Sequence, residues 1–254
     1  ALPIFKSIIE PLGGKLKYII AGGAALDKEI SLFFDSIGIS VLQGYGLTET
    51  APVLAAENYG CRRAGSIGVP LPGVEFEIFE KDANGIGEVR VRGKNIMLGY
   101  YEDQALTDEV IRDGWFYTGD LGYFDKDGYI FLTGRKKDMI VLKNGKKVFP
   151  DEIEAIINRL DVVEESMVFG LPELDGDYKL SAKVVYNKEV AEKVYPGKSF
   201  EELKEIVWEK IKEINKGFPP YKYIKNLILT DEELIKTTTK KVKRQEEMKK
   251  ILGE

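Results

Sequence analysis

Two stretches decide the fold: Leu16-Lys-Tyr-Ile-Ile-Ala-Gly-Gly23 and Ile39-Ser-Val-Leu-Gln-Gly-Tyr-Gly46. Each is a short apolar run, typical of a buried strand, that ends in glycines. Because a helical pattern separates them, we expect a right-handed parallel crossover. In parallel sheets, ligands bind outside the carboxyl ends of the strands, and both glycine clusters fall at those ends. This coincidence is the first indication of a binding site.

The segment between the two strands, residues 27–37, has helical periodicity. Asp27 is suited to cap its N-terminus, and Gly38 is suited to end it. Its apolar residues recur on one face: Ile30, Phe33, Phe34 and Ile37. Residues 1–57 are therefore predicted to form an α/β portion.

Residues 58–133 change to short alternating runs separated by Pro, Gly and Asp. Two of these runs are Val74-Glu-Phe-Glu-Ile-Phe79 and Gly87-Glu-Val-Arg-Val-Arg92. Asp125-Lys-Asp-Gly128 is typical of a turn between two further strands. The alternation predicts an antiparallel sheet or a small barrel.

After Gly134 the pattern becomes α+β. Pro150-Asp-Glu-Ile-Glu154 predicts the start of a helix, because proline suits the first turn and acidic residues suit the positive end. Ser199-Phe-Glu-Glu202 has capping-box spacing ahead of another helix. The predicted fold class is thus mixed: the end of an α/β parallel sheet, a small antiparallel β portion and a C-terminal α+β domain.

The composition excludes several kinds of chemistry. The 254 residues contain no histidine, so His-based hydrolysis, His-ligated zinc and imidazole general-base catalysis are not available. Cys61 is the one cysteine, which favours a reducing, cytoplasmic setting. The net charge of −5 argues against a nucleic-acid partner. No apolar run approaches the ~20 residues of a membrane span, which leaves peripheral membrane contact open.

Three motifs carry groups suited to a nucleotide. Gly44-Tyr-Gly-Leu-Thr-Glu-Thr50 offers a glycine turn, an aromatic ring, a hydroxyl and a carboxylate, or simply a glycine turn with a helix cap. In Tyr117-Thr-Gly-Asp120, the Asp could accept both ribose hydroxyls at a strand entrance, or cap a turn. In Gly134-Arg-Lys-Lys-Asp138, the Arg could bind the same sugar or phosphate, or form a surface ion pair worth under ~1 kcal/mol.

The order and spacing of the motifs resemble the adenylate-forming superfamily of acyl-CoA synthetases, firefly luciferases and peptide-synthetase adenylation domains. The resemblance runs nearly end to end and rests on six segments: residues 22–25, 44–50, 65–73, 87–93, 113–120 and 134–154. The last segment is most similar to long-chain fatty acid–CoA ligases. The resemblance implies that ATP and a medium- to long-chain fatty acid give acyl-AMP and pyrophosphate, and that CoA then takes the acyl group.

Binding roles follow from the resemblance, residue by residue. The residues implied in binding ATP, AMP or CoA are Gly22, Gly23, Ala24, Gly44, Tyr45, Gly46, Asp120, Arg135 and Gly145. Among them, residues 22–24 line the adenine pocket and Tyr45 stacks on the adenine. Asp120 binds the ribose hydroxyls with Arg135 beside them, and Gly145 lies in the segment that approaches CoA.

The catalytic residues that the resemblance implies are Thr48, Glu49 and Lys241. Thr48 would contact the α-phosphate, and Glu49 would hold Mg²⁺. Lys241 would reach the α-phosphate and the carboxylate, where a cation could lower the barrier by ~3 kcal/mol. The superfamily lysine usually follows a glycine. Here Lys240 stands in the glycine's place and remains a rival for the role.

The resemblance also implies how the chain is divided. Residues 1–136 would belong to the large AMP-binding domain, with its β-rich portion at 58–133, and residues 137–254 would form a small mobile lid. Lys137 would be the hinge between them. One orientation of the lid would bring Lys241 to the phosphate, and another would present the Gly145 segment for the thiol step.

The superfamily's Ser/Thr/Gly-rich loop ending in Pro-Lys-Gly, which grips the β- and γ-phosphates, is not in the sequence. The chain opens with Ala1-Leu2-Pro3, without a signal-peptide pattern. We therefore expect a part of a ligase that needs the N-terminal part of the same enzyme and is inactive alone. The alternatives are adenylation with a carrier-protein thiol as acceptor, and a nucleotide-binding or interaction module without chemistry.

Overall fold

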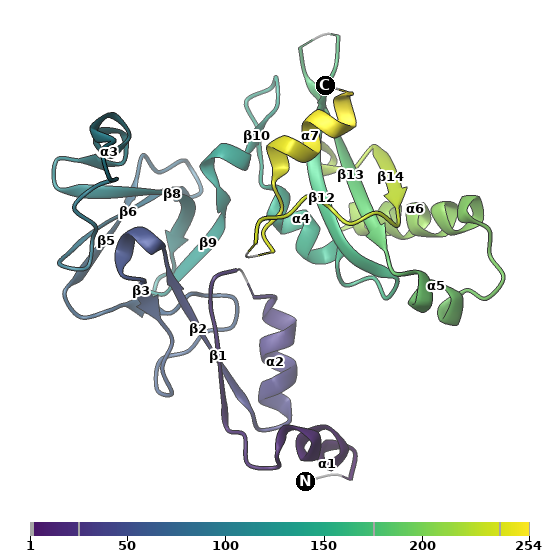
Figure 1. Ribbon diagram of the computed structural model, residues 1–254, viewed down its shortest axis with the longest axis horizontal. Coiled ribbons are helices and arrows are strands. Elements are labelled where there is room, and N and C mark those ends of the chain that lie inside the picture. The colour runs from purple at the N-terminus through teal and green to yellow at the C-terminus, as the bar shows by residue number, and fades with distance from the viewer. Residues whose placement is uncertain (1–2, 25, 175, 239, 254) are drawn as a thin grey trace. The chain divides into compact units, whose positions relative to one another are not determined.

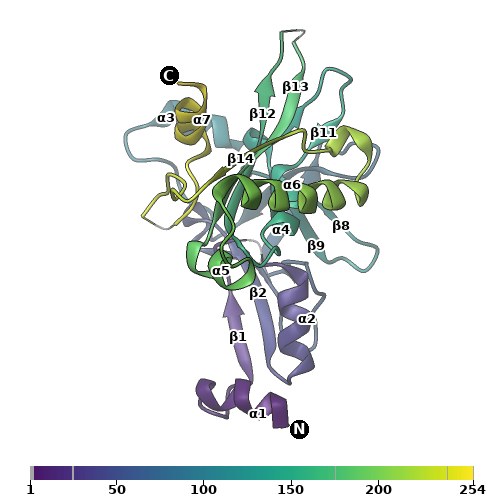
Figure 2. The same cartoon turned by 90° about the vertical axis from the view of Figure 1, so that its right-hand side faces the viewer.

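The computed structural model describes residues 3–24, 26–174, 176–238 and 240–253, so Ala1, Leu2 and Ala25 of the sequence motifs lie outside the described residues. The chain divides into two compact units, Ala1–Lys136 and Lys137–Glu254. Figures 1 and 2 show the elements of both units.

The first unit begins with a β-α-β arrangement. Its elements are α1 (Pro3–Ile9), the 3₁₀ helix η1 (Glu10–Leu12), β1 (Tyr18–Ala21), α2 (Lys28–Ser36) and β2 (Ser40–Gly46). Strands β1 and β2 are parallel, and α2 lies beside them (Figure 1), which confirms the predicted parallel pairing. Asp27 caps α2 by accepting a hydrogen bond of 2.8 Å from the amide of Glu29. Gly38 follows the helix with φ +86°, a left-handed conformation that glycine adopts without strain.

The apolar face predicted for α2 is only partly covered by the described residues. Ile37 is buried, whereas Ile30 and Phe33 are 47% and 48% exposed. On β1, Ile20 is 84% exposed. The helical pattern therefore identified the helix correctly, but it did not identify which of its apolar residues are buried.

The predicted glycine turn at Gly44–Gly46 is wrong, because these residues lie inside strand β2. Beyond Gly46, the 3₁₀ helix η2 (Thr48–Thr50) leads to β3 (Val53–Ala56), which pairs antiparallel with β2 and with β4 (Val69–Pro70). A Cβ on Gly46 would overlap the carbonyl oxygen of Pro52. The glycine thus serves the close approach of two chain segments.

The β-rich portion is an antiparallel sheet, as predicted. Its elements are β5 (Val74–Phe79), β6 (Gly87–Gly93), α3 (Gln104–Val110), β7 (Ile111–Arg112), β8 (Trp115–Phe124) and β9 (Ile130–Arg135). The strand order is β5-β6-β8-β7, with β9 also on β8, and the predicted turn at 125–128 joins β8 to β9. One core cluster combines Tyr45 and Leu54 of the first sheet with Val89 and Phe116 of this one. The two sheets therefore share a hydrophobic core.

The second unit is α+β, as predicted. Its first element is the 3₁₀ helix η3 (Lys136–Asp138), which begins at the last residue of the first unit. Its other elements are β10 (Ile140–Val141), β11 (Lys147–Val148), α4 (Pro150–Ile157), β12 (Val163–Pro172), β13 (Tyr178–Tyr186), α5 (Lys188–Val194), α6 (Phe200–Lys216), the 3₁₀ helix η4 (Pro220–Lys222), β14 (Asn226–Thr230) and α7 (Arg244–Leu252). Strand β12 pairs antiparallel with β13, which pairs parallel with β14. Pro150 begins α4, and Ser199 with Glu202 forms the predicted capping box of α6.

Helices cover both faces of this three-stranded sheet. On one face, α4 and α6 pack through Ile153 and Val207 into a cluster that includes Val168 of β12 (Figure 2). On the other face, Met167 of β12 belongs to a second cluster, against which Met248 of α7 packs. Adjacent β12 residues thus point to opposite faces, as strand geometry requires. Among the helices of the described residues, none combines the length and the apolar character that crossing a membrane requires.

Candidate active site

The two glycine clusters predicted at the strand ends lie side by side. Gly22 follows β1, and a Cβ placed on it would be 3.2 Å from the carbonyl oxygen of Gly44 in β2. Gly22, Gly23 and Ala24 are all exposed. The carboxyl end of the parallel strand pair therefore presents bare backbone, which a flat ligand can approach closely.

Tyr45, between Gly44 and Gly46, is buried in the core. It is 9% exposed, and its hydroxyl donates a hydrogen bond of 2.6 Å to Oδ2 of Asp120. Burial raises the pKa of the Tyr45 phenol above its ordinary value, and the charge of Asp120 raises it further. The phenol therefore stays protonated and serves as a permanent donor to the carboxylate.

A bulge in β8 aims Asp120 at this phenol. Glu88 pairs with Leu121 and Arg90 with Tyr117, so the three residues 118–120 face Val89 alone. Within the bulge, Gly119 has φ +71°, and the Thr118 hydroxyl accepts a hydrogen bond from the Asp120 amide. Asp120 thus lies inside a strand. The sequence predictions of a strand entrance or a turn cap are wrong on this point.

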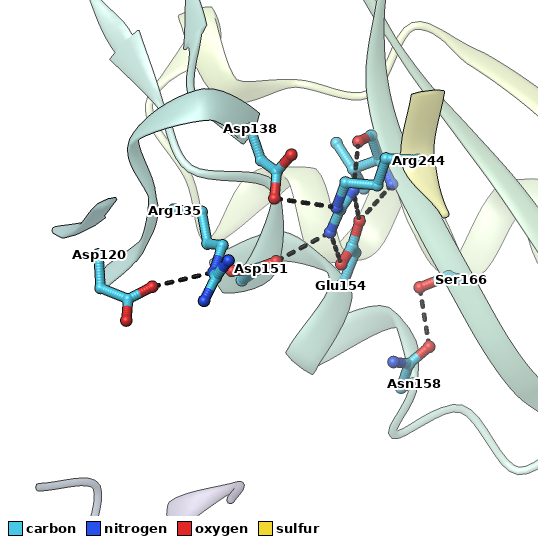
Figure 3. Close-up of polar contacts among 9 residues, drawn as sticks. Asp120, Arg135, Asp138, Asp151, Glu154, Asn158, Ser166 and Arg244 are labelled. Carbon is cyan, nitrogen blue, oxygen red and sulfur yellow. Dashed lines mark hydrogen bonds and ion pairs between the residues drawn. The ribbon is translucent and has the colours of Figure 1, made fainter. Parts of the chain in front are cut away.

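Arg135 completes the polar chain from the other side. Its Nε lies 3.0 Å from Oδ1 of Asp120 (Figure 3), in the register that pairs the two residues across β8 and β9. The Arg135 side chain is 40% exposed, whereas that of Asp120 is 8% exposed. An ionised carboxylate offers about four acceptor sites, which is the chemistry that the hydroxyl donors of a sugar require.

Glu49 is held in place by a residue that sequence reasoning missed. Its Oε1 accepts a hydrogen bond of 2.9 Å from the Tyr100 hydroxyl, and its carbonyl accepts one of 2.8 Å from the Met97 amide. Thr48, its neighbour in η2, is exposed. Nothing in the sequence links Glu49 with Tyr100, because 51 residues separate them.

The surroundings of Glu49 fit a magnesium ion bound together with phosphate. Mg²⁺ is usually held by one or two carboxylates, substrate phosphates and water, and not by a dedicated protein cage. Within the described ranges, no group of three or more His, Cys, Asp or Glu residues could hold a metal. Glu49, held in place by Tyr100, is one carboxylate of this kind.

The basic tail forms a tight loop whose geometry distinguishes its two candidate lysines. Lys236 and Val242 form an antiparallel bridge, and the amide of Thr237 donates to the carbonyl of Lys241 at 2.8 Å. Lys240 has φ +61°, a left-handed conformation that favours glycine. Lys240 therefore occupies the conformation of a glycine, and the exposed Lys241 is the lysine that follows it.

The last two predicted residues lie at the surface of the second unit. Gly145 is in the hairpin that joins β10 and β11, with φ +76°. Lys137 is exposed in η3 and is the first residue of the second unit. The roles predicted for both remain predictions.

Comparison with known proteins identifies the family of the chain. Residues 5–101 match the family model of AMP-binding enzymes, and residues 137–251 match that of the AMP-binding enzyme C-terminal domain. The chain belongs to the AMP-binding enzyme superfamily. The two matches include most of the segments from which the resemblance was inferred, although residues 113–120 and 134–136 lie outside both. The predicted family is confirmed.

Curated relatives of this AMP-binding enzyme include ligases for two different thiols. The chain is 37% identical over 226 residues to a chloroplastic long-chain-fatty-acid–[acyl-carrier-protein] ligase of Arabidopsis thaliana, covering 82% of the chain and 30% of that protein. It is 34% identical over 181 residues to a long-chain-fatty-acid–CoA ligase of Bacillus subtilis, covering 68% of the chain and 32% of that protein. The chain therefore spans about a third of the length of these relatives.

Solved structures confirm the fold class. An ATP-bound RpMatB–BxBclM chimera is 29% identical, with a TM-score of 0.80, covering 96% of this chain and 48% of that one. Anthranilate CoA ligase AuaEII in complex with anthranoyl-AMP is 25% identical, with a TM-score of 0.76, covering 92% of this chain and 44% of that one. The fold of this chain thus corresponds to about half the length of each of these ligases.

Proposed function

We propose that this chain supplies the ribose-binding, metal-binding and lysine-bearing parts of an ATP-dependent fatty acid–CoA ligase. The observation that carries the proposal is the polar chain from Tyr45 through Asp120 to Arg135, next to the glycines at the ends of β1 and β2. A buried carboxylate that is held on both oxygens is the type of group that suits the two hydroxyls of a ribose.

The proposed reaction has two steps. A carboxylate oxygen of the fatty acid forms a bond to the α-phosphorus of ATP, and the bond from that phosphorus to the bridging oxygen breaks, releasing pyrophosphate. The thiol sulfur of CoA, having lost its proton, then attacks the acyl carbon, and AMP leaves. In the first step two anions meet, so a positive charge at the α-phosphate is the main requirement.

We assign the groups on this chain to that requirement. Thr48 and Glu49 face the phosphates, where Mg²⁺ would neutralise charge when bound to Glu49. Tyr100 holds the Glu49 carboxylate in one orientation. Lys241 supplies the mobile cation to the α-phosphate, and Lys137 is the hinge that lets it arrive and leave. Gly145 belongs to the surface that CoA approaches.

A carrier-protein thiol is the second candidate acceptor, because the Arabidopsis relative is named as an acyl-carrier-protein ligase. The test is to join this chain to the N-terminal part of a ligase and to supply ATP, a fatty acid and either CoA or a phosphopantetheinylated carrier protein. We expect acyl-CoA as the main thioester. Acylation of the carrier alone would exclude the CoA assignment in favour of the second candidate.

The same assay examines whether the chain acts alone. Because the sequence holds no Ser/Thr/Gly-rich loop for the β- and γ-phosphates, we expect no pyrophosphate release from the 254-residue chain by itself. Robust release with ATP and a fatty acid would show that the phosphates are gripped by other groups. The assignment of roles to Thr48 and Glu49 would then need revision.

A further inference from the structure

Arg244 ties the loop that carries Lys241 to several separate parts of the second unit. Its Nη1 and Nη2 donate to the two carboxylate oxygens of Glu154 at 2.8 and 2.6 Å. Nη2 also donates to Asp151 at 2.8 Å, Nη1 to the carbonyl of Val168 at 3.2 Å, and Nε lies 3.7 Å from Asp138 (Figure 3). The guanidinium therefore donates four hydrogen bonds through Nη1 and Nη2, and its Nε lies at ion-pair distance from Asp138.

These partners come from three different elements. Asp138 ends η3, one residue after the proposed hinge, Asp151 and Glu154 are on α4, and Val168 is in β12. Arg244 itself begins α7, three residues after Lys241. Its side chain is 20% exposed and that of Glu154 is 12% exposed, so solvent screens this pair weakly. One side chain thus joins the start of the unit, a core helix and the sheet to the downstream end of the lysine loop.

The upstream end of the loop is anchored as well. Glu165 accepts from the amide of Leu234 at 3.0 Å and pairs with Lys236 at 2.9 Å. Glu247, which is 0% exposed, accepts from the amide of Ile235 at 2.9 Å and pairs with Lys183 of β13. Buried charge therefore fixes the backbone on both sides of the loop, while Lys241 within the loop is exposed.

We propose that Arg244 is the positioning residue for Lys241, which it holds at a fixed place relative to the first residues after the hinge. The proposal rests on the function proposed above. A lysine side chain has a flexible four-carbon stem, so the position of its ammonium group is defined only if the backbone that carries it is fixed. A displacement of ~1 Å at such a group lowers a rate by about 10²-fold. A buried ion cluster that fixes the backbone of the loop therefore contributes to the rate by keeping the lysine in place.

Hydrogen exchange of the 254-residue chain tests the anchoring directly. Arg244→Lys keeps the charge but cannot span both oxygens of Glu154 together with Asp151. We expect the described amides of 236–238 and 240–243 to exchange at least tenfold faster, with those of β12 and β13 unchanged. The matched control is Lys222→Met, which removes a 2.6 Å pair with Glu152 on the same helix α4 and lies outside the loop. Unchanged exchange in the loop of Arg244→Lys would overturn the proposal.

Partial reactions of the ligase assembled from this chain and an N-terminal part test the consequence. Arg244→Lys should lower kcat for acyl-AMP formation by 10- to 100-fold, with the KM for ATP little changed, and should spare thioester formation from supplied acyl-adenylate. Equal losses in both steps would indicate a merely structural role and would contradict the proposal. Lys241→Ala separates the two ideas. If it leaves adenylation intact while Arg244→Lys loosens the loop, the proposed function of Lys241 fails and the anchoring stands.

Discussion

Asp120 and Glu154 are both buried carboxylates paired with an arginine, yet the groups around them differ. Asp120 faces a neutral phenol and an arginine that is 40% exposed. Glu154 faces Arg244, which is 20% exposed, and also accepts a hydrogen bond of 2.6 Å from the Val168 amide. We call the first pair open, because its arginine is 40% exposed, and the second pair closed, because Asp151 and the Val168 amide also surround it. On the proposed function, the open pair would bind a ligand, whereas the closed pair holds a backbone.

The same substitution in both pairs should have the largest and most unequal effect on stability. Arg244→Met leaves the Glu154 charge buried without a counterion, at a cost of roughly 3–5 kcal/mol in the free energy of unfolding. Arg135→Met should cost less than this, because that arginine is 40% exposed and Asp120 keeps its hydrogen bond from the Tyr45 hydroxyl. The chain has two tryptophans, Trp115 in the first unit and Trp208 in the second, so each unit has its own fluorescence reporter.

Denaturation would therefore be followed in two backgrounds. Arg244→Met is measured with Trp115→Phe, so that Trp208 reports the second unit, and Arg135→Met is measured with Trp208→Phe. Each is compared with its own single-tryptophan parent. Similar losses in the two units would mean that the open and closed pairs are not different in kind.

Lys241→Ala should have the next largest effect, on the rate alone. If the closed cluster exists to present Lys241, removing the lysine should lower kcat for adenylation by about 10²–10³-fold, or ~3–4 kcal/mol, as for the loss of a transition-state donor. Stability should not change, since Lys241 is exposed. The control is Lys243→Ala, which removes a nearby lysine that pairs with Glu246. A loss of similar size in the control would point to the charge of the tail and not to one residue.

Asp120→Asn tests the open pair and should lower the affinity for AMP. The amide keeps the size of the side chain but removes its charge and one acceptor, so affinity for AMP in the assembled ligase should fall by about 10- to 100-fold, or ~1.5–3 kcal/mol, the range for hydrogen bonds to charged groups. Titration calorimetry with AMP measures this. Asp35→Asn, which breaks a 2.9 Å pair with Arg62 elsewhere in the first unit, should leave the affinity unchanged. Undiminished affinity in Asp120→Asn would remove the ribose assignment.

Local rules predicted much of the fold, since their causes lie within a few residues of each other. The cap of α2 by Asp27, the Pro150 helix start and the Ser199 capping box were all predicted from neighbouring residues and are present. The glycine turn at 44–46 failed because the same glycines also suit a strand into which another segment packs closely. A local pattern does not distinguish a turn from a close approach.

The candidate site was predictable in its residues but not in its connections. Motif spacing pointed to Asp120 and Arg135, yet the bulge that orients Asp120 depends on the pairing of β8 with β6. Arg244 was visible only as part of a basic tail, because its partner Glu154 is 90 residues away. Charge pairs across such separations are created by tertiary packing. Sequence patterns therefore selected Asp120 and Arg135 for the candidate site but did not predict the contacts that hold them.

Lys240→Gly should have the smallest effect, and it settles which lysine the closed cluster presents. With φ +61°, Lys240 bears the strain of a left-handed residue, which costs about 1–2 kcal/mol, while glycine loses ~0.5–1 kcal/mol more in chain entropy on folding. The net change should lie between zero and a gain of ~1 kcal/mol, followed through Trp208. Lys240→Ala removes the same charge and keeps the strain, so it should show no gain. If Lys241 is the reacting lysine, Lys240→Gly retains adenylation, since only the backbone conformation at residue 240 matters. Loss of adenylation in both Lys240 variants would instead assign the reaction to Lys240.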